Sequence, residues 1–136
     1  MNANKVIIQT DGAARGNPGP AAIGATLKDE KGNLIAGISR RIGVTTNNQA
    51  EYLAIIAALE EAISLGAGHV ELKADSELVV KQLNGSYRVK NAALKPLYQK
   101  AIRLIGSLEG FKIAHIPRAQ NAEADKLANK AFDSIQ

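Results

Sequence analysis

Short apolar runs and loose alternation of apolar and polar residues fill the first third of the chain, and both patterns are typical of β-strands. They predict strands over residues 5–11, 21–28 and 33–42. The glycine- and proline-rich residues 12–20 and a polar turn at residues 29–33 separate these strands. Because strands joined by short turns pair antiparallel, we expect the chain to open with a three-stranded antiparallel meander.

The period of the apolar positions then changes to that of a helix. A helix is predicted over residues 48–65, with Thr45, Thr46 or Asn47 able to cap its start and Gly66 after its end. The remaining predicted elements alternate: a strand over 69–75, a helix from Ser76 to about residue 83, a helix over 92–108, a strand over 111–116 and a helix over 122–132. A meander followed by this alternation predicts an α/β domain with a mixed sheet flanked by helices.

Length and composition agree with one globular domain over residues 1–136, because 46% hydrophobic residues can fill one core of ordinary size. The absence of cysteine excludes disulfides and thiolate metal sites and permits a reducing compartment. The apolar run near the N-terminus is far shorter than the roughly 20 residues that span a bilayer. We therefore expect a monomeric cytoplasmic protein without a membrane segment.

Four carboxylates stand at boundaries of the predicted elements. Asp11 ends the first strand, Asp75 ends the fourth, Glu51 lies one turn into a helix, and Asp125 lies near the start of the last helix. If the first and fourth strands are parallel neighbours, Asp11 and Asp75 meet at the sheet edge where open α/β sheets bind ligands. Such an all-oxygen cluster suits Mg²⁺ or Mn²⁺ and disfavours zinc.

Each acid also has an ordinary structural interpretation. Asp11 precedes Gly12 and suits a turn, and Asp75 suits a helix cap together with its neighbour Ser76. Glu51 suits a solvated first turn, where the helix dipole favours a negative charge. Asp125 suits a surface ion pair with Lys126 or Lys130 of the same helix. Taken together, however, the four acids favour a shared cation.

The charge pattern favours a polyanionic partner. The chain carries 17 Lys and Arg residues against 13 Asp and Glu residues, and setting the four candidate ligands aside raises the excess from +4 to +8. No acidic residue lies between Glu77 and Glu109, an interval that holds several cations: Lys81, Arg88, Lys90, Lys95, Lys100 and Arg103. This interval is either an ordinary solvated helix face or a phosphate track. Aromatic residues make up only 4%, so base stacking is a poor explanation.

Four segments resemble, in order and over nearly the whole chain, the motif blocks of type 1 ribonuclease H. They are TDGAARGNPGPAAIG, TTNNQAEYLAIIAAL, KADSELVVKQLNG and HIPRAQNAEADKLAN. The resemblance implies a ribonuclease H-like fold with a five-stranded mixed sheet, an antiparallel meander plus parallel strands, and helices on both faces. It also implies a catalytic domain that cuts the RNA strand of RNA–DNA hybrids and leaves 5′-phosphate and 3′-hydroxyl ends.

The same resemblance implies a site with two divalent ions, which activate water and stabilise the leaving oxygen. In this scheme Asp11 is shared by both ions, Glu51 and Asp75 complete one side, and Asp125 completes the other. Mg²⁺ is the expected cofactor, with Mn²⁺ as a substitute.

Amides beside the carboxylates are candidates for reading the 2′-hydroxyl, which only RNA carries. They are Asn17 in the GNPG turn and three successive residues at a helix start: Asn47, Asn48 and Gln49. Asparagine is also common in turns and caps, so a purely structural role is the alternative. By resemblance, Thr46 and Asn91 match positions that hold a phosphate of the DNA strand.

The chain departs from many family members in two ways. Only NGSYRVKNAA stands where they carry a basic helical protrusion, so that source of substrate affinity is missing. They also place a histidine in a loop ahead of the last aspartate, and here a gapless count puts His115 there, at the end of a predicted strand. Arg118 in the loop PRAQN is the better candidate, and its role would be phosphate binding or product release, since arginine stays protonated.

Two alternatives to a hybrid-specific ribonuclease remain open. One is a nuclease of the same fold that acts on double-stranded RNA or branched DNA, although the amides favour a reader of the 2′-hydroxyl. The other is a non-catalytic hybrid-binding module, against which the presence of all four acids argues.

Overall fold

The computed structural model describes residues 4–133. The described chain forms one sheet of five strands: β1 (Lys5–Ala14), β2 (Gly19–Lys28), β3 (Leu34–Thr45), β4 (His69–Ala74) and β5 (Gly110–His115). The strands are accompanied by four α-helices and one 3-10 helix: α1 (Asn47–Ser64), α2 (Glu77–Leu83), α3 (Lys95–Gly106), η1 (Arg118–Asn121) and α4 (Ala122–Asp133).

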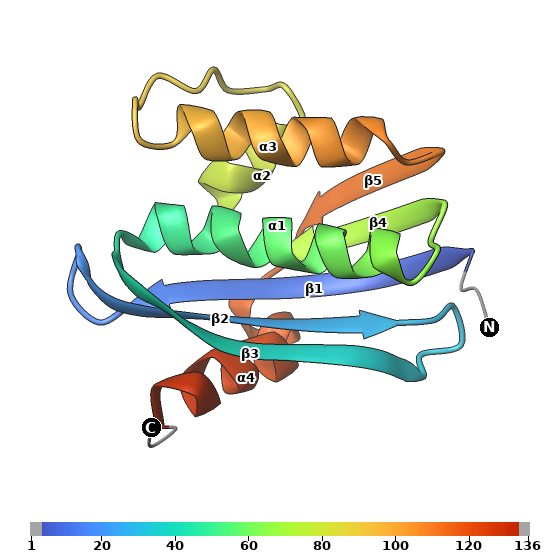
Figure 1. The fold of residues 1–136 in the computed structure, drawn as a ribbon, viewed down its shortest axis with the longest axis horizontal. Coiled ribbons are helices and arrows are strands. Elements are labelled where there is room, and N and C mark those ends of the chain that lie inside the picture. The colour runs from blue at the N-terminus through green and yellow to red at the C-terminus, as the bar shows by residue number, and fades with distance from the viewer. Residues whose placement is uncertain (1–3, 134–136) are drawn as a thin grey trace.

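The sheet is mixed, with the strand order β3-β2-β1-β4-β5. β1, β2 and β3 pair antiparallel as a meander, whereas β4 and β5 run parallel to β1. α1 packs on one face together with α2 and α3, and α4 packs on the other face against β1, β2 and β3 (Figure 1). The predicted mixed sheet, an antiparallel meander plus parallel strands with helices on both faces, is therefore confirmed.

β1 is longer than predicted, and Asp11 does not end it. The strand continues to Ala14, and Asp11 pairs with Gly24 of β2. The parallel ladder between β1 and β4 nevertheless stops at Thr10 and Ala74, one residue before Asp11 and Asp75. The two aspartates consequently leave the same end of the parallel ladder, which is the juxtaposition that the sequence predicted.

Two glycines let helices approach the sheet closely around Asp11. A Cβ on Gly12 would overlap the backbone of Ala50 in α1, and a Cβ on Gly24 would overlap the backbone of Ala124 in α4. Gly12 follows Asp11 in the chain and Gly24 is its partner across the strands. Any side chain at these positions would push a helix away, so the glycines bring both carboxylate-bearing helices up to Asp11.

The helix starts differ from the prediction for local reasons. α1 begins at Asn47 with Thr46 as its N-cap, because Gln49 N–H donates to Thr46 Oγ1 (3.2 Å) and Thr46 N–H donates to Gln49 Oε1 (3.1 Å). α3 begins at Lys95 rather than at residue 92, because the Asn91 side chain accepts from Ala93 N–H and holds the preceding residues in a turn. η1 occupies part of the PRAQN segment that was predicted as a loop.

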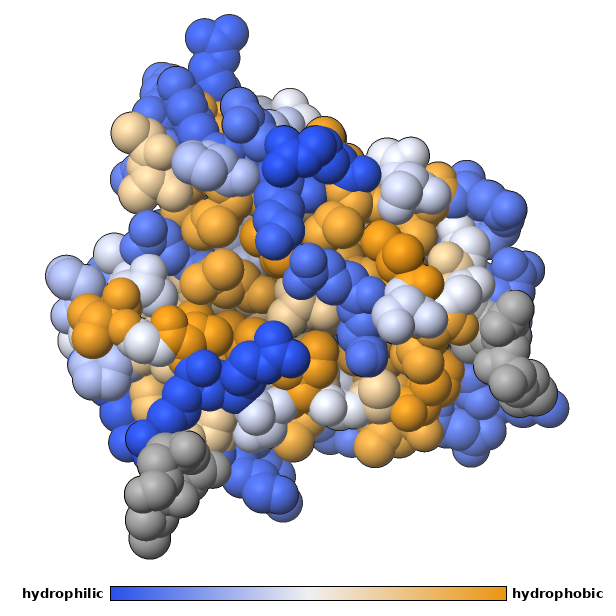
Figure 2. All heavy atoms as spheres, viewed as in Figure 1, coloured by the Kyte–Doolittle hydropathy of each residue, from blue (hydrophilic) through white to orange (hydrophobic). Residues whose placement is uncertain are grey.

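The core lies between the sheet and α1, and its large members are fully buried: Val6, Ile8, Ile23, Leu27, Tyr52, Ile55, Leu59, Leu72 and Val79. Tyr52 donates to Gln82 Oε1 (2.6 Å), which satisfies a polar pair inside this core. Figure 2 shows hydrophobic residues reaching the surface in a band crossed by hydrophilic side chains. Among residues 4–133, no helix is long and apolar enough to cross a membrane.

Candidate active site

Four elements bring the predicted carboxylates together in one pocket. Asp11 comes from β1, Glu51 from α1, Asp75 from the end of β4 and Asp125 from α4, and all four line it. Single oxygens of Asp11, Glu51 and Asp75 lie within 4.8 Å of one another. The Asp125 carboxyl lies outside this set of three but lines the same pocket, and its proximity raises the pKa of Asp11.

The environments of the acids argue against their ordinary structural interpretations. Asp11 is only 7% exposed, so it is not a surface turn residue. Glu51 is only 8% exposed, so it is not a solvated first-turn glutamate. The cap of α2 is Ser76, whose Oγ accepts from Val79 N–H, which leaves the Asp75 side chain for the pocket. Asp125 faces the same pocket and accepts from Asn129 Nδ2 (3.3 Å).

Burial and mutual repulsion make the metal-free cluster costly to ionise. Burial, the charge of Asp75 and the nearby Asp125 carboxyl together raise the pKa of Asp11 from 3.8 to about 7, and burial contributes most. Burial also raises the pKa of Glu51 well above its usual range, with smaller contributions from Asp11 and Asp75. The pKa values of Asp11 and Glu51 are raised for the same reason: negative charges are held close together and away from water.

A divalent cation fits this arrangement. Glu51 Oε2 is buried without a hydrogen-bond partner among the described residues, whereas buried carboxylate oxygens normally have one. The donor set is all oxygen, as hard cations such as Mg²⁺ prefer. A bound cation would remove the repulsion and give the orphaned oxygen a partner, so the cluster is a candidate metal centre.

Without metal, the protein should lose stability as the pH rises from about 4 to about 7. Between about pH 4 and pH 7 folded Asp11 binds more protons than unfolded Asp11, so unfolding becomes easier by up to about 1.4 kcal/mol per pH unit. Melting curves in EDTA should show this decline, and Asp11→Asn should flatten it. Added Mg²⁺ should raise the melting temperature more at about pH 8 than at about pH 5, because protons compete for the ligands. Equal slopes for wild type and variant would show that Asp11 ionises as an ordinary carboxylate.

Arg118 and His115 occupy different surroundings. Arg118 lies on η1 with its side chain 84% exposed, lines the carboxylate pocket, and places Nη2 at 3.9 Å from Asp125 Oδ1. His115 ends β5, and its Nε2 lies 3.2 Å from the backbone oxygen of Asp75. Of the two, Arg118 is the residue that borders the pocket.

The predicted amides border the carboxylates in two adjoining pockets. Asn47 and Asn48 line the carboxylate pocket itself. A second pocket has Asn48 in common with the first. Its lining contains all the other predicted substrate contacts, Asn17, Thr46, Gln49 and Asn91, together with Ala93 and Leu94. Asn48 therefore stands at the junction of the two pockets.

Several of these amides already hold the local fold through their carbonyl oxygens. Asn47 Oδ1 accepts from Ala14 N–H (2.8 Å), Asn17 Oδ1 accepts from Asn47 N–H (3.1 Å), and Asn91 Oδ1 accepts from Ala93 N–H (2.8 Å). Gln49 Oε1 is part of the helix cap. These bonds use the carbonyl oxygens, so within residues 4–133 the NH₂ groups of these amides have no acceptor and their positions are fixed.

One polar residue of the site was missed from the sequence. Asn121 is fully buried, and its Nδ2 donates both to Thr10 O (2.8 Å) and to Asp75 Oδ2 (3.1 Å). In the sequence it stands just before a predicted helix, where an asparagine is most simply interpreted as a cap. Only the fold places it beside Asp75.

Comparison with known proteins identifies relatives along the whole described domain. The "Reverse transcriptase-like" family model matches residues 9–131. Ribonuclease HI of Halobacterium salinarum is 47% identical over 90% of this chain, and Ribonuclease H of Nitrosomonas eutropha is 36% identical over 96% of this chain and 91% of its own length. The chain spans 62% of the Halobacterium relative and 36% of the bifunctional protein Rv2228c of Mycobacterium tuberculosis.

Solved structures agree. RNase H1 from Halobacterium salinarum NRC-1 superimposes with a TM-score of 0.92 at 46% identity, covering 95% of this chain and 98% of that one. LC11-RNase H1, solved in complex with an RNA/DNA hybrid, gives a TM-score of 0.90 at 47% identity, covering 94% and 96%. With the family model, the similar relatives, the shared fold and the buried carboxylate cluster in agreement, this chain belongs to the ribonuclease H family.

Proposed function

We propose that this protein is an endoribonuclease that hydrolyses the RNA strand of RNA–DNA hybrids and leaves 5′-phosphate and 3′-hydroxyl ends. The observation that carries the proposal is a buried carboxylate cluster that opens onto a pocket lined with amides. The carboxylates supply the chemistry of phosphodiester hydrolysis, and the amides supply contacts that distinguish RNA from DNA. The hybrid held by the related LC11 enzyme supports the same substrate class.

Asp11, Glu51 and Asp75 would hold the divalent cations, with Asp125 completing the set beside Asp11. Two Mg²⁺ ions, or Mn²⁺ in their place, would lower the pKa of the attacking water and neutralise charge on the leaving oxygen. Asp11 is the member that interacts with the other three, since Asp75 and Asp125 raise its pKa and its own charge raises the pKa of Glu51. This central position supports Asp11 as the ligand that both ions share.

The amides would read the RNA strand. Asn48 is exposed and lies at the junction of the carboxylate pocket and the amide pocket, so a nucleotide bound at the carboxylates would pass its side chain. Asn47 borders the same carboxylates, and its bond to Ala14 N–H directs its NH₂ group. An NH₂ donor beside the ribose can bond the 2′-hydroxyl, whereas a deoxyribose offers no partner there.

The second pocket and the basic segment beyond it would follow the DNA strand. Thr46 and Asn91 both line that pocket, together with Asn17 and Gln49. The loop from α2 to α3 passes over the N-terminal end of α1 (Figure 1). This loop and the start of α3 carry exposed cations without an ion pair among the described residues: Arg88, Lys90 and Lys95. Their charge would attract a phosphate backbone in place of a basic protrusion.

Arg118 would contact a phosphate or speed product departure. We expect Arg118→Ala to lower the cleavage rate by about 10-fold to 100-fold, the range of a charged contact worth about 1.4 to 2.8 kcal/mol. The residue is exposed, so the melting temperature should stay unchanged. Histidine at this position should recover part of the rate.

His115→Ala is the matched comparison, because His115 stands beside the backbone of Asp75 but not on the pocket wall. It should cost less activity than Arg118→Ala. A larger defect for His115→Ala would reverse the assignment of the two residues.

The proposed function is tested by giving four substrates of one sequence to the protein in parallel: RNA–DNA hybrid, duplex RNA, duplex DNA and single-stranded RNA. Cleavage of the hybrid that depends on Mg²⁺ or Mn²⁺ is the expected result. Efficient cutting of duplex DNA would instead favour a recombination-type nuclease, and comparable cutting of duplex RNA would widen the substrate class. Tight hybrid binding without any cleavage would indicate a binding module.

A further inference from the structure

Asn121 occupies the place where the parallel ladder between β1 and β4 ends. The ladder stops at Thr10 and Ala74, and the next residues are Asp11 and Asp75. At this point Asn121 Nδ2 donates to Thr10 O (2.8 Å). One side-chain amide is thus bonded to the last residue of β1 in the parallel ladder, directly beside the two aspartates.

The second hydrogen of the same nitrogen goes to the carboxylate cluster. Asn121 Nδ2 donates to Asp75 Oδ2 at 3.1 Å, which ties one oxygen of this carboxylate to the residue before Asp11. Both neighbours of Nδ2 are acceptors only, so a flipped amide would place Oδ1 against two other oxygens. The orientation of Asn121 is therefore fixed by its partners.

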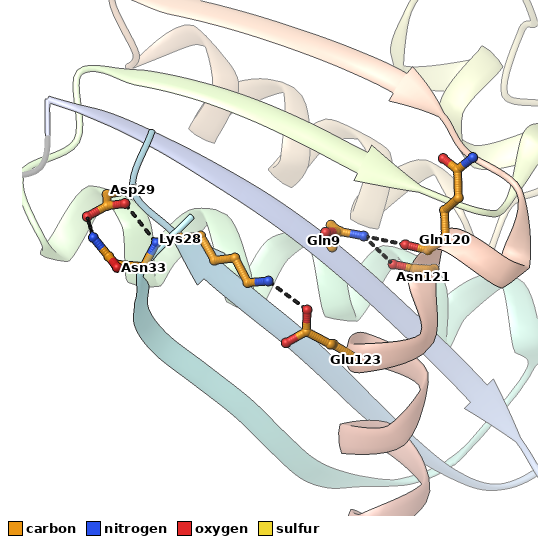
Figure 3. A network of polar contacts seen from close by, with 7 residues as sticks. All are labelled: Gln9, Lys28, Asp29, Asn33, Gln120, Asn121 and Glu123. Carbon is orange, nitrogen blue, oxygen red and sulfur yellow. Dashed lines mark hydrogen bonds and ion pairs between the residues drawn. The ribbon is translucent and has the colours of Figure 1, made fainter. Parts of the chain in front are cut away.

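The other end of the Asn121 side-chain amide, Oδ1, is also held by a neighbour. Gln9 Nε2 donates to Gln120 O (2.9 Å) and reaches Asn121 Oδ1 (3.4 Å), as Figure 3 shows. Lys28 pairs with Glu123 (2.6 Å) in the first turn of α4, which fastens the same segment to β2 (Figure 3). Asn121 is fully buried at the end of η1 and directly precedes α4, the two elements that carry Arg118 and Asp125.

We propose that Asn121 is a positioning residue that fixes the Asp75 carboxylate at its distance from Asp11 and so preorganises the cation site. Without this bond, two carboxylates that repel each other are free to turn apart. The cation then has to gather them as it binds, at a cost in affinity. The proposal rests on the proposed function for its relevance to catalysis, but its effect on cation binding does not depend on any substrate.

The test is titration of the protein with Mn²⁺ alone, by calorimetry and by the electron paramagnetic resonance signal of free Mn²⁺. Asn121→Ala should bind Mn²⁺ about 10-fold to 100-fold more weakly than wild type, the range found when a partner of a metal ligand is removed. With saturating Mn²⁺ and hybrid substrate, kcat should fall while KM changes little. A role in folding alone would lower the melting temperature but would not move Mn²⁺ affinity at temperatures well below melting.

Two further variants keep the test decisive if Asn121→Ala folds poorly. Asn121→Ser leaves a short polar side chain before α4 that cannot reach Asp75, so it should lose Mn²⁺ affinity like Asn121→Ala. Gln9→Leu keeps Asn121 and removes only its anchor, so it should give a smaller loss of several-fold.

Gln82→Ala is the matched control, because it removes another buried amide whose partner, Tyr52, lies in the core. It should destabilise the fold and leave Mn²⁺ affinity unchanged. Wild-type Mn²⁺ affinity and kcat in Asn121→Ala and Asn121→Ser would overturn the proposal while leaving the proposed function intact. If wild type failed to cut hybrid, the proposed function would fall, and the Mn²⁺ titrations would still decide the role of Asn121.

Discussion

Asp11→Asn should lower the rate of hybrid cleavage by at least about 1,000-fold, equivalent to about 4 kcal/mol of activation free energy. The substitution keeps the size of the side chain and its capacity to accept hydrogen bonds, but it removes the negative charge at the centre of the cluster. Glu51, Asp75 and Asp125 all interact with this carboxyl, so no neighbour can replace it. Single-turnover cleavage of a labelled hybrid at saturating Mg²⁺ measures the effect.

Binding of the hybrid should survive the same change. The amide pocket and the basic loop lie away from Asp11, and their contacts do not depend on its charge. The metal-free variant should also be more stable than wild type at neutral pH, because a repelling buried carboxylate has gone. Near-normal turnover of Asp11→Asn would refute the role of the cluster as the catalytic metal centre.

Asp29→Asn provides a control with the same change in charge and shape. Asp29 lies in the turn between β2 and β3, where it accepts from the backbone N–H groups of Lys31 and Asn33. An asparagine there keeps an acceptor oxygen, so the turn should persist. Wild-type activity for Asp29→Asn would show that the loss in Asp11→Asn comes from its place in the site and not from a change in net charge.

The fold was predictable because each strand and helix buries one face. The apolar residues of that face therefore recur in the sequence with the period of a strand or a helix. The helix over residues 48–65 differs from α1 by one residue at each end, since apolar spacing, the cap and Gly66 agree there. β1 was predicted too short for the opposite reason. Gly12 lies in a glycine- and proline-rich segment, and such a segment predicts a turn. In the structure, Gly12 lies within β1, where the missing side chain allows the close approach of α1. That close approach exists only in the folded chain.

The proximity of the carboxylates in the candidate site was predictable, but their environments were not. Residue type and spacing identified the four carboxylates and indicated that Asp11 and Asp75 would meet. Whether Glu51 is solvated or buried depends on how closely α1 approaches β1, which no local pattern encodes. Asn121 was missed because its partners, Thr10 and Asp75, are 111 and 46 residues away in the chain.

Replacing Asn47 and Asn48 together by alanine should lower hybrid cleavage by about 100-fold or more, since each lost hydrogen bond to the 2′-hydroxyl costs about 1 to 2 kcal/mol. The single variants should separate an effect on substrate recognition from an effect on the stability of the fold. Asn48→Ala should lose activity at an unchanged melting temperature, because its side chain is exposed and holds no bond among the described residues. Asn47→Ala should also lose about 0.5 to 1 kcal/mol of stability, because Ala14 N–H loses its acceptor.

A double-mutant cycle between protein and substrate tests whether Asn48 contacts the 2′-hydroxyl. Hybrids carrying a single deoxyribonucleotide at successive positions should each slow the wild type, most strongly at the nucleotide that Asn48 reads. If the contact is direct, Asn48→Ala should be insensitive to the same replacement, because the interaction is already absent. Losses that simply add, with the variant as sensitive to the deoxyribonucleotide as wild type, would show that Asn48 acts on another part of the substrate and that the 2′-hydroxyl is read elsewhere in the pocket.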